Sequence, residues 1–256
     1  MQARLKDRAI VVVGAGTGIG AATVERLCAE GARVCAADLN LPAAQVIAAR
    51  MTASGHEAHA LGVDIADEDS VGACIADAAA LLGGIDGVHV NAADMGAIMQ
   101  DSDALGVDLA IFDRTIAVNL RGHLLCTRAA LPHLLESPHG AIVYTSSAAA
   151  ISGEPERPSY AASKSGLNAL MRHVASKWGR QGLTANCVAP GFVMTPEMVA
   201  AGTVPPEWID HCLAHTRSTR LGRVEDIAAM VALLLSADGR WINGQVIHVN
   251  GGTLLT

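Results

Sequence analysis

Near the start of the chain, an apolar run, a glycine-rich turn and a helical pattern follow one another without interruption. Residues 9–13 are all apolar and mostly β-branched, which predicts a central parallel strand covered on both faces. Residues 14–20 read Gly-Ala-Gly-Thr-Gly-Ile-Gly, and residues 21–30 have helical periodicity that ends at Gly31. Glycines in this position let the backbone approach a pyrophosphate, while the helix N-terminus supplies unpaired N–H groups. The stretch predicts a nucleotide-binding start to the fold.

Strand-like and helix-like segments then alternate along the chain. Further strands are predicted at 33–37, 56–63, 87–91, 141–147, 183–189 and 245–249. Helices are predicted at 41–54, 67–82, 109–135, 158–179 and 223–235. This alternation requires right-handed crossovers and places ligands at the carboxyl ends of the strands. We expect one α/β domain over residues 1–256: a Rossmann-type, doubly wound fold with a seven-stranded parallel sheet and helices on both faces.

Composition narrows the classes of function. The formal net charge is −7 and the basic residues are scattered, so neither nucleic acid nor an anionic membrane is an expected partner. The chain begins without a signal-like segment and contains no apolar stretch of about 18 residues, so a cytoplasmic location is expected. Its six cysteines are expected to be free, buried thiols, and no metal site is expected among the cysteines and ten histidines.

The segment from Ser147 to Lys164 carries the candidate chemistry. Tyr160 and Lys164 are four residues apart, so on a helix they project from the same face. A phenol has a pKa near about 10, and a cation held close to it favours the phenolate. Ser147 ends a buried strand, where its hydroxyl can bind a substrate oxygen. Alone, such a pair is a weak signal, because a solvated helix face also carries it by chance.

Together with Asn119 and the glycine run, these residues resemble the short-chain dehydrogenase/reductase family, over Arg8 to Gly252. The resemblance implies that Ser147 holds the substrate oxygen, Tyr160 transfers the proton, and Lys164 lowers the tyrosine pKa and grips the nicotinamide ribose. It implies that Asn119 holds a water linking Lys164 to solvent, although a capping or kink role remains open. The expected reaction interconverts a secondary alcohol and a ketone by hydride transfer.

Asp38 bears on the choice of cofactor. It follows the strand at 33–37, eighteen residues past Gly20, where a carboxylate can bind the adenosine ribose hydroxyls. A 2′-phosphate would meet like charge there, and no Arg or Lys occupies positions 15–17 or 39–40 to compensate. NAD is therefore expected in preference to NADP. A role for Asp38 as a helix cap before residues 41–42 is the alternative.

The resemblance extends to the other cofactor contacts. Gly14, Gly18 and Gly20 match the family pattern Gly-x-x-x-Gly-x-Gly. The resemblance implies that Asp64 and Ile65 lie against the adenine, although Asp64 could be a turn residue. Val193 and Thr195 are implied to lie near the carboxamide. The residues expected to contact the dinucleotide are Gly14, Thr17, Gly18, Ile19, Gly20, Asp38, Leu39, Asp64, Ile65, Asn91, Ala92, Ala93, Tyr160, Lys164, Pro190, Gly191, Val193 and Thr195.

Two departures from the family pattern stand out. Val13 replaces a usual Thr, and residues 91–94 read Asn-Ala-Ala-Asp where Asn-Asn-Ala-Gly is usual. We interpret these changes as a rebuilt hydrogen-bond connection between the first and fourth strands. One hypothesis is that Asp94 recognises a polar or cationic substrate, and the alternative is an exposed loop aspartate.

Residues 195–220 combine weak periodicity with three prolines, which predicts a mobile lid that determines the substrate, or else a structural insertion. Residues 95–108 are expected to form loop and short turns. Glu154 and Arg157 could face either substrate or solvent. Steroid, sugar, polyol, aromatic-side-chain and small aliphatic alcohols all remain possible substrates.

The helices at 109–135 and 158–179 resemble those that form the family's dimer faces, and the last strand another contact, so a homotetramer is expected. Other functions remain as alternatives. A non-catalytic NAD-binding sensor would not need the four candidate catalytic residues, and a ketoacyl reductase conflicts with Asp38. An enoyl reductase usually spaces its tyrosine and lysine more widely.

Overall fold

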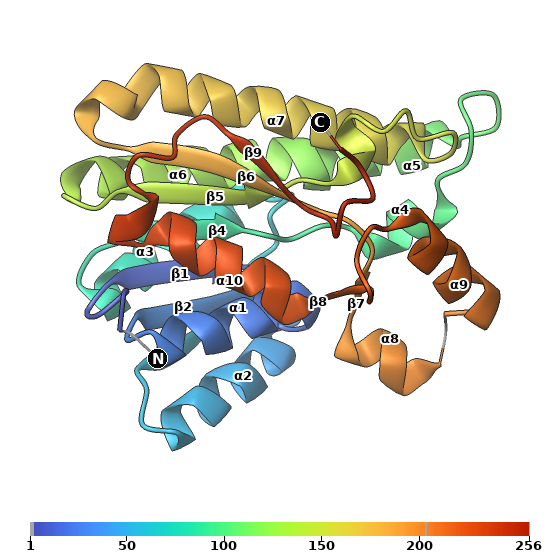
Figure 1. The fold of residues 1–256 in the computed structure, drawn as a ribbon. Helices are drawn as coiled ribbons and strands as arrows, with labels where there is room; N and C mark the ends of the chain where they lie inside the picture. Colours follow the sequence, from blue (N-terminus) through green and yellow to red (C-terminus); the bar gives the residue numbers. More distant parts are fainter. Residues whose placement is uncertain (1–2, 203, 256) are drawn as a thin grey trace.

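A seven-stranded parallel sheet forms the centre of the computed structural model, which describes residues 3–202 and 204–255 (Figure 1). The strand order is β3-β2-β1-β4-β5-β6-β9, and every pairing is parallel. Its strands are β1 (Ala9–Val13), β2 (Arg33–Asp38), β3 (Ala58–Gly62), β4 (Gly87–Val90), β5 (Ala141–Thr145), β6 (Thr184–Pro190) and β9 (Val246–Val249). The order reverses between β1 and β4, the switch point where open α/β sheets bind ligands. The predicted fold class is confirmed.

Each face of the sheet has its own hydrophobic core. Along β1, Ile10 and Val12 belong to one core while Val11 and Val13 belong to the other, because successive strand side chains point to opposite faces. The first core packs under α1 (Gly18–Ala29), α2 (Leu41–Ala53) and α10 (Val224–Leu235). The second packs under α3 (Glu68–Leu82), α6 (His123–Glu136) and α7 (Pro158–Trp178). Burial on both faces explains the continuous apolar runs.

The predicted helix at 109–135 is wrong in its interior. The structure has α5 (Leu109–Ile116), a π-helical segment η1 (Ala117–Gly122) and then α6. Gly122 allows the close approach that this segment makes, because a Cβ there would lie 2.7 Å from the carbonyl oxygen of Ile65. Asn119 therefore lies in a π-helical turn, a feature that is frequent at functional sites.

Two expected loops also contain helices. Residues 95–108 begin with α4 (Met95–Gln100), whose N-terminus is capped by Asp94. The lid contains α8 (Pro196–Ala201) and α9 (Pro206–His215), and prolines in the first turn suit both starts. A small sheet of β7 (Val193–Met194) and β8 (Gly222–Arg223) joins the two ends of the lid. Short 3₁₀ turns are found at Ala148–Ala150, Gly179–Gln181 and Ala237–Gly239.

Two simple properties of the described residues bear on the sequence expectations. All six cysteines are free, as expected, and five are buried, whereas Cys212 on α9 is only partly buried. Within residues 3–202 and 204–255, no helix is both long enough and apolar enough to cross a membrane.

Candidate active site

The helices α8 and α9 lie beyond the carboxyl ends of the central strands (Figure 1). Residues from these strand ends and from both helices line one large cavity. Its volume is about 1540 Å³, larger than the roughly 300–1,000 Å³ usual for a single ligand pocket. Every residue of the expected dinucleotide set lines it except Gly20, and Ser147 lines it as well. Asn119 does not. The cavity therefore has room for a dinucleotide and a second molecule side by side.

The glycine turn is shaped for close backbone contacts. Gly14 and Gly18 have φ values of 83° and 53°, a region that glycine reaches without strain. Gly20 lies behind the cavity wall, where a Cβ would be only 1.8 Å from the carbonyl oxygen of Gly14. Its role is thus to let the turn fold tightly against α1. A direct contact between Gly20 and the dinucleotide stays a prediction.

The N-terminus of α1 already attracts an anion. The N–H of Gly18 donates to a carboxylate oxygen of Glu197, 3.3 Å away on α8. Helix N-termini bind phosphate for the same electrostatic reason. The turn therefore fits the pyrophosphate of a dinucleotide, and Glu197 is a lid residue near that position that sequence reasoning missed.

Asp38 is held with its carboxylate toward the cavity. Its two oxygens accept hydrogen bonds from the backbone N–H groups of Gly16 and Asn40, each at 2.8 Å. The alternative role of helix cap falls to Asn40, whose side chain accepts from the N–H of Ala43 at 3.3 Å. Leu39, exposed beside it, and Asp64 with the buried Ile65 continue the same wall of the cavity.

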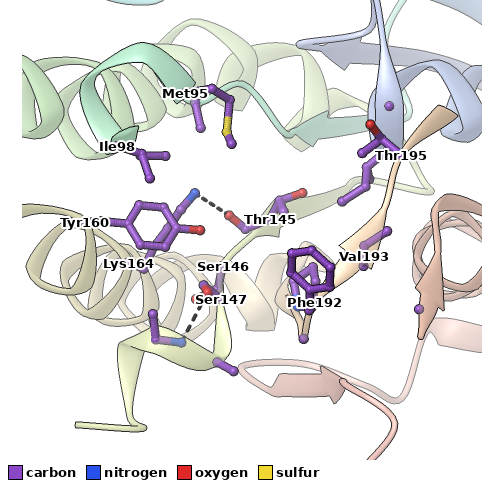
Figure 2. A pocket seen from close by; sticks show the side chains of 18 of the residues that line it. Met95, Ile98, Thr145, Ser146, Ser147, Tyr160, Lys164, Phe192, Val193 and Thr195 are labelled. Atoms are coloured by element: carbon purple, nitrogen blue, oxygen red, sulfur yellow. Dashed lines mark hydrogen bonds between the residues drawn. The ribbon is translucent and has the colours of Figure 1, made fainter. Parts of the chain in front are cut away.

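Ser147, Tyr160 and Lys164 meet at the other half of the cavity (Figure 2). Ser147 follows β5, and Tyr160 lies in the first turn of α7. Pro158 begins this helix, at a position where the N–H that proline lacks is not needed for the helix. Lys164 lies one turn later, fully buried, with its Nζ 5.7 Å from the centre of the Tyr160 ring. The sequence spacing therefore brings these three side chains together as expected.

The electrostatics differ from the sequence expectation. Burial raises the pKa of Tyr160, while the Ser147 hydroxyl and the Arg157 charge act to lower it. The Lys164 ammonium does not turn to the phenol oxygen, because it donates to the carbonyl oxygen of Thr145 at 2.8 Å. Burial also lowers the pKa of Lys164 to about 8. In this geometry the Ser147 hydroxyl, rather than the Lys164 ammonium, is the main group that favours the phenolate.

Asn119 acts on the loop after β4. Its Oδ1 accepts a hydrogen bond from the backbone N–H of Asp94 at 3.0 Å. Its Nδ2 is buried without a hydrogen-bond partner among the described residues. A buried amide needs partners for both ends, so this donor is available to a water molecule.

Asp94 has partners of its own. One oxygen accepts from the N–H of Ala97 at 2.9 Å, which caps α4, and the other lies 2.8 Å from Nε of Arg114. Although burial acts to raise the pKa of Asp94, these contacts hold it below its usual value. The carboxylate thus stabilises the cavity wall, and its role in recognising a polar or cationic substrate stays a hypothesis. Arg114 lies on α5, and nothing in its local sequence identified it.

Side-chain hydrogen bonds connect β1, β4 and β5 beneath the site. Asn91 donates to the carbonyl oxygen of Gly14 at 3.0 Å and accepts from the hydroxyl of Thr145 at 2.9 Å. That hydroxyl is also 2.9 Å from Nε2 of the fully buried His89. Burial lowers the pKa of His89 to about 3, so its ring is neutral at physiological pH. One network therefore joins β1, β4 and β5 beneath the site.

Glu154 and Arg157 both line the cavity and form an ion pair of 2.9 Å with each other. Arg157 has a left-handed backbone, with φ 60° and ψ 53°, and its N–H donates to the carbonyl oxygen of Ser102 at 2.7 Å. The open question of where these two side chains point is thus answered. They face the cavity, and each neutralises the other.

Sequence reasoning overlooked the apolar walls and one histidine spacing. The lining includes five large apolar side chains that no motif marks: Met95, Ile98, Met99, Phe192 and Trp208. On α9, His211 and His215 are four residues apart, a common metal-ligand spacing, with ring centres 4.2 Å apart. Across the described part of the chain, no three His, Cys, Asp or Glu side chains are grouped to hold a metal ion.

A glycine turn, an acidic residue at the end of β2 and a Ser–Tyr–Lys cluster at one cavity define a Rossmann-type oxidoreductase. The family profile described as Enoyl-(Acyl carrier protein) reductase matches residues 14–253. A probable short-chain type dehydrogenase/reductase from Bradyrhizobium diazoefficiens is 40% identical, covering 98% of this chain and 89% of its own. The chain belongs to the short-chain dehydrogenase/reductase family.

Two other similarities cover nearly the whole chain. The cis-4-hydroxycyclohexanecarboxylate dehydrogenase of Sinomonas cyclohexanicum is 35% identical, covering 96% of each chain. The crystal structure of levodione reductase aligns with a TM-score of 0.90 at 32% identity, covering 97% of this chain and 98% of that one.

Proposed function

We propose that the protein is an NAD(H)-preferring oxidoreductase that interconverts a secondary alcohol and a ketone. One observation supports this most: Ser147, Tyr160 and Lys164 share a cavity with a glycine turn that accommodates a pyrophosphate. The described residues fit a nicotinamide dinucleotide, since the turn presents N–H groups and Asp38 presents a fixed carboxylate. The residues proposed to hold the dinucleotide are those of the expected set that line the cavity.

In the proposed oxidation, a nicotinamide dinucleotide held in the cavity would supply the hydride acceptor for the carbinol carbon. Ser147 holds the alcohol oxygen, and Tyr160 takes the proton from that oxygen as the ketone forms. Lys164, fixed by Thr145, holds the nicotinamide ribose with its charge. Asn119 supplies its free Nδ2 to a water that relays the proton toward solvent. The reverse reaction returns the proton from Tyr160 to the ketone oxygen.

The preference for NAD rests on Asp38. Both of its oxygens are fixed by backbone N–H groups, so the carboxylate cannot turn away from a 2′-phosphate without losing two hydrogen bonds. The neighbouring positions 15–17 and 39–40 contribute no basic side chain. A small-molecule alcohol or ketone, a homotetrameric assembly and a cytoplasmic location complete the proposal.

The test follows NADH formation at 340 nm with a panel of secondary alcohols. Tyr160→Phe should lose about 10²–10⁴-fold in kcat/KM, the usual contribution of acid–base catalysis. Tyr144→Phe is the matched control, because Tyr144 is fully buried and its hydroxyl contacts Thr127. A Tyr160→Phe protein that kept most of its activity would refute the assignment. NADH binding without turnover of any alcohol or ketone would favour the sensor.

A further inference from the structure

Three flat side chains stand in a row on the lid side of the cavity. The Phe192 and Trp208 rings meet edge to face, with centroids 6.4 Å apart. Trp208 and His211 are stacked at 5.3 Å with an angle of 17° between their planes. Figure 2 shows the Phe192 ring across the cavity from Tyr160. The row therefore begins opposite the proposed catalytic tyrosine and extends outward along α9.

Aromatic residues are scarce in this chain, which makes their position informative. The sequence holds only two Phe, two Tyr and three Trp residues. Tyr160, Phe192 and Trp208 all line this one cavity. Besides the proposed catalytic Tyr160, two of the remaining aromatic residues thus give this cavity flat apolar surface.

A second apolar part of the cavity lining comes from α4. Met95 and Met99 line the cavity with 55% and 81% of their surface exposed, and Trp208, which also lines it, is 46% exposed. Large apolar side chains left open around a cavity mark a binding surface. Methionine side chains adapt their shape to what they contact. The cavity thus offers a rigid aromatic wall and an adaptable aliphatic wall.

Two ion pairs line this end of the cavity. Asp94 pairs with Arg114 at 2.8 Å, and Glu154 pairs with Arg157 at 2.9 Å. A charged substrate group that paired with any of these four side chains would compete with its present partner. Discrimination by shape and apolar contact requires no such cost.

We infer that Trp208 is a specificity-determining residue for ring-bearing substrates: uncharged alicyclic or aryl secondary alcohols and their ketones, whose ring packs against the Phe192–Trp208 face. This inference rests on the proposed function and names its substrate class. A flat ring matches the aromatic face over a large area and adds favourable ring–ring geometry. An acyclic chain of equal carbon number loses more rotational freedom when it is ordered in the same space.

The experiment compares cyclohexanol with 2-hexanol, two secondary alcohols with the same number of carbons. The wild-type protein should favour cyclohexanol in kcat/KM by about tenfold or more. Trp208→Ala should lower kcat/KM for cyclohexanol about tenfold while changing that for 2-hexanol less than about threefold. Trp208→Phe should keep most of the preference. Trp241→Ala, at a fully exposed position, is the matched control and should leave both values unchanged.

Three results would overturn the inference. The first is a higher kcat/KM of the wild type for 2-hexanol than for cyclohexanol. The second is an equal loss of kcat/KM for both alcohols in Trp208→Ala. The third is a strong preference for a carboxylated ring substrate that Arg157→Gln abolishes. Binding is tested separately by tryptophan fluorescence with cyclohexanone. If the wild type turns over no alcohol but cyclohexanone still quenches a signal that Trp208→Phe lacks, the ring site stands and the proposed function fails. If neither turnover nor quenching occurs, both fail.

Discussion

Replacing His123 with leucine is a direct test of how burial controls charge beneath the active site. His123 is fully buried at the start of α6, and neither ring nitrogen has a hydrogen-bond partner among the described residues. Burial first, and then the Lys164 charge, lower its pKa to about 3. The ring therefore stays neutral in the folded protein at every pH where the protein is usually handled.

The sign of the effect follows from the two pKa values. An unfolded histidine has a pKa near about 6.5, so between pH 6.5 and 3 the unfolded chain binds a proton that the folded chain does not. Stability must fall as the pH decreases through that window. At pH 5, about 1.5 units below the unfolded value, the loss attributable to His123 is about 2 kcal/mol. Leucine has no proton to bind and removes this loss.

Urea unfolding at pH 7.5, 6 and 5 measures the difference. At pH 7.5, His123→Leu should lie within about 1 kcal/mol of the wild type, because no hydrogen bond is lost and the side chains are similar in size. At pH 5 the variant should be more stable by about a further 2 kcal/mol. His139→Leu, at an exposed position, should follow the wild type. Equal acid losses in wild type and His123→Leu would refute the reasoning.

Two further predictions concern cofactor binding. Asp38→Ser removes a charge that would repel a 2′-phosphate by up to about 4 kcal/mol at 4 Å. The ratio of kcat/KM with NADP⁺ to kcat/KM with NAD⁺, measured from the absorbance at 340 nm, should therefore rise at least about tenfold. An unchanged ratio would contradict the role of Asp38. Glu197→Gln removes a carboxylate that contacts Gly18, where the pyrophosphate is proposed to bind, and should tighten NADH binding about two- to fivefold at low salt, as expected for exposed charges. Fluorescence titration with Glu207→Gln as the control checks this, and equal tightening in both variants would show a general charge effect instead.

The central fold could be predicted because its signals are local. A parallel strand buried on both faces reads as a continuous apolar run, as residues 9–13 do, and glycine marks the turn that follows. The Tyr160–Lys164 pair was equally readable, because helical spacing alone puts two such side chains on one face. At these positions, neighbours in sequence decide the structure.

Other features depend on partners distant in sequence and could not be read locally. The π-helical turn at Asn119 depends on contact between Gly122 and Ile65, more than fifty residues away. Arg114 finds Asp94 only once α5 is packed beside the loop after β4. The direction in which the Lys164 ammonium points is set by the Thr145 carbonyl on a neighbouring strand. Periodicity carries no information about such contacts.

The π-helical segment at Ala117–Gly122 also sets the directions of the side chains that it carries. It fits one more residue into its turn than an α-helix would, so each of its residues turns through less than the about 100° of an α-helical residue. Deleting a single residue from this segment would give an unbroken α-helix of nearly the same length and rotation. α5 and α6 would then keep their relative orientation, and Arg114 would stay beside Asp94. The deletion would instead redirect side chains within the segment, Asn119 among them, so the extra residue adjusts local direction without turning the helices on either side.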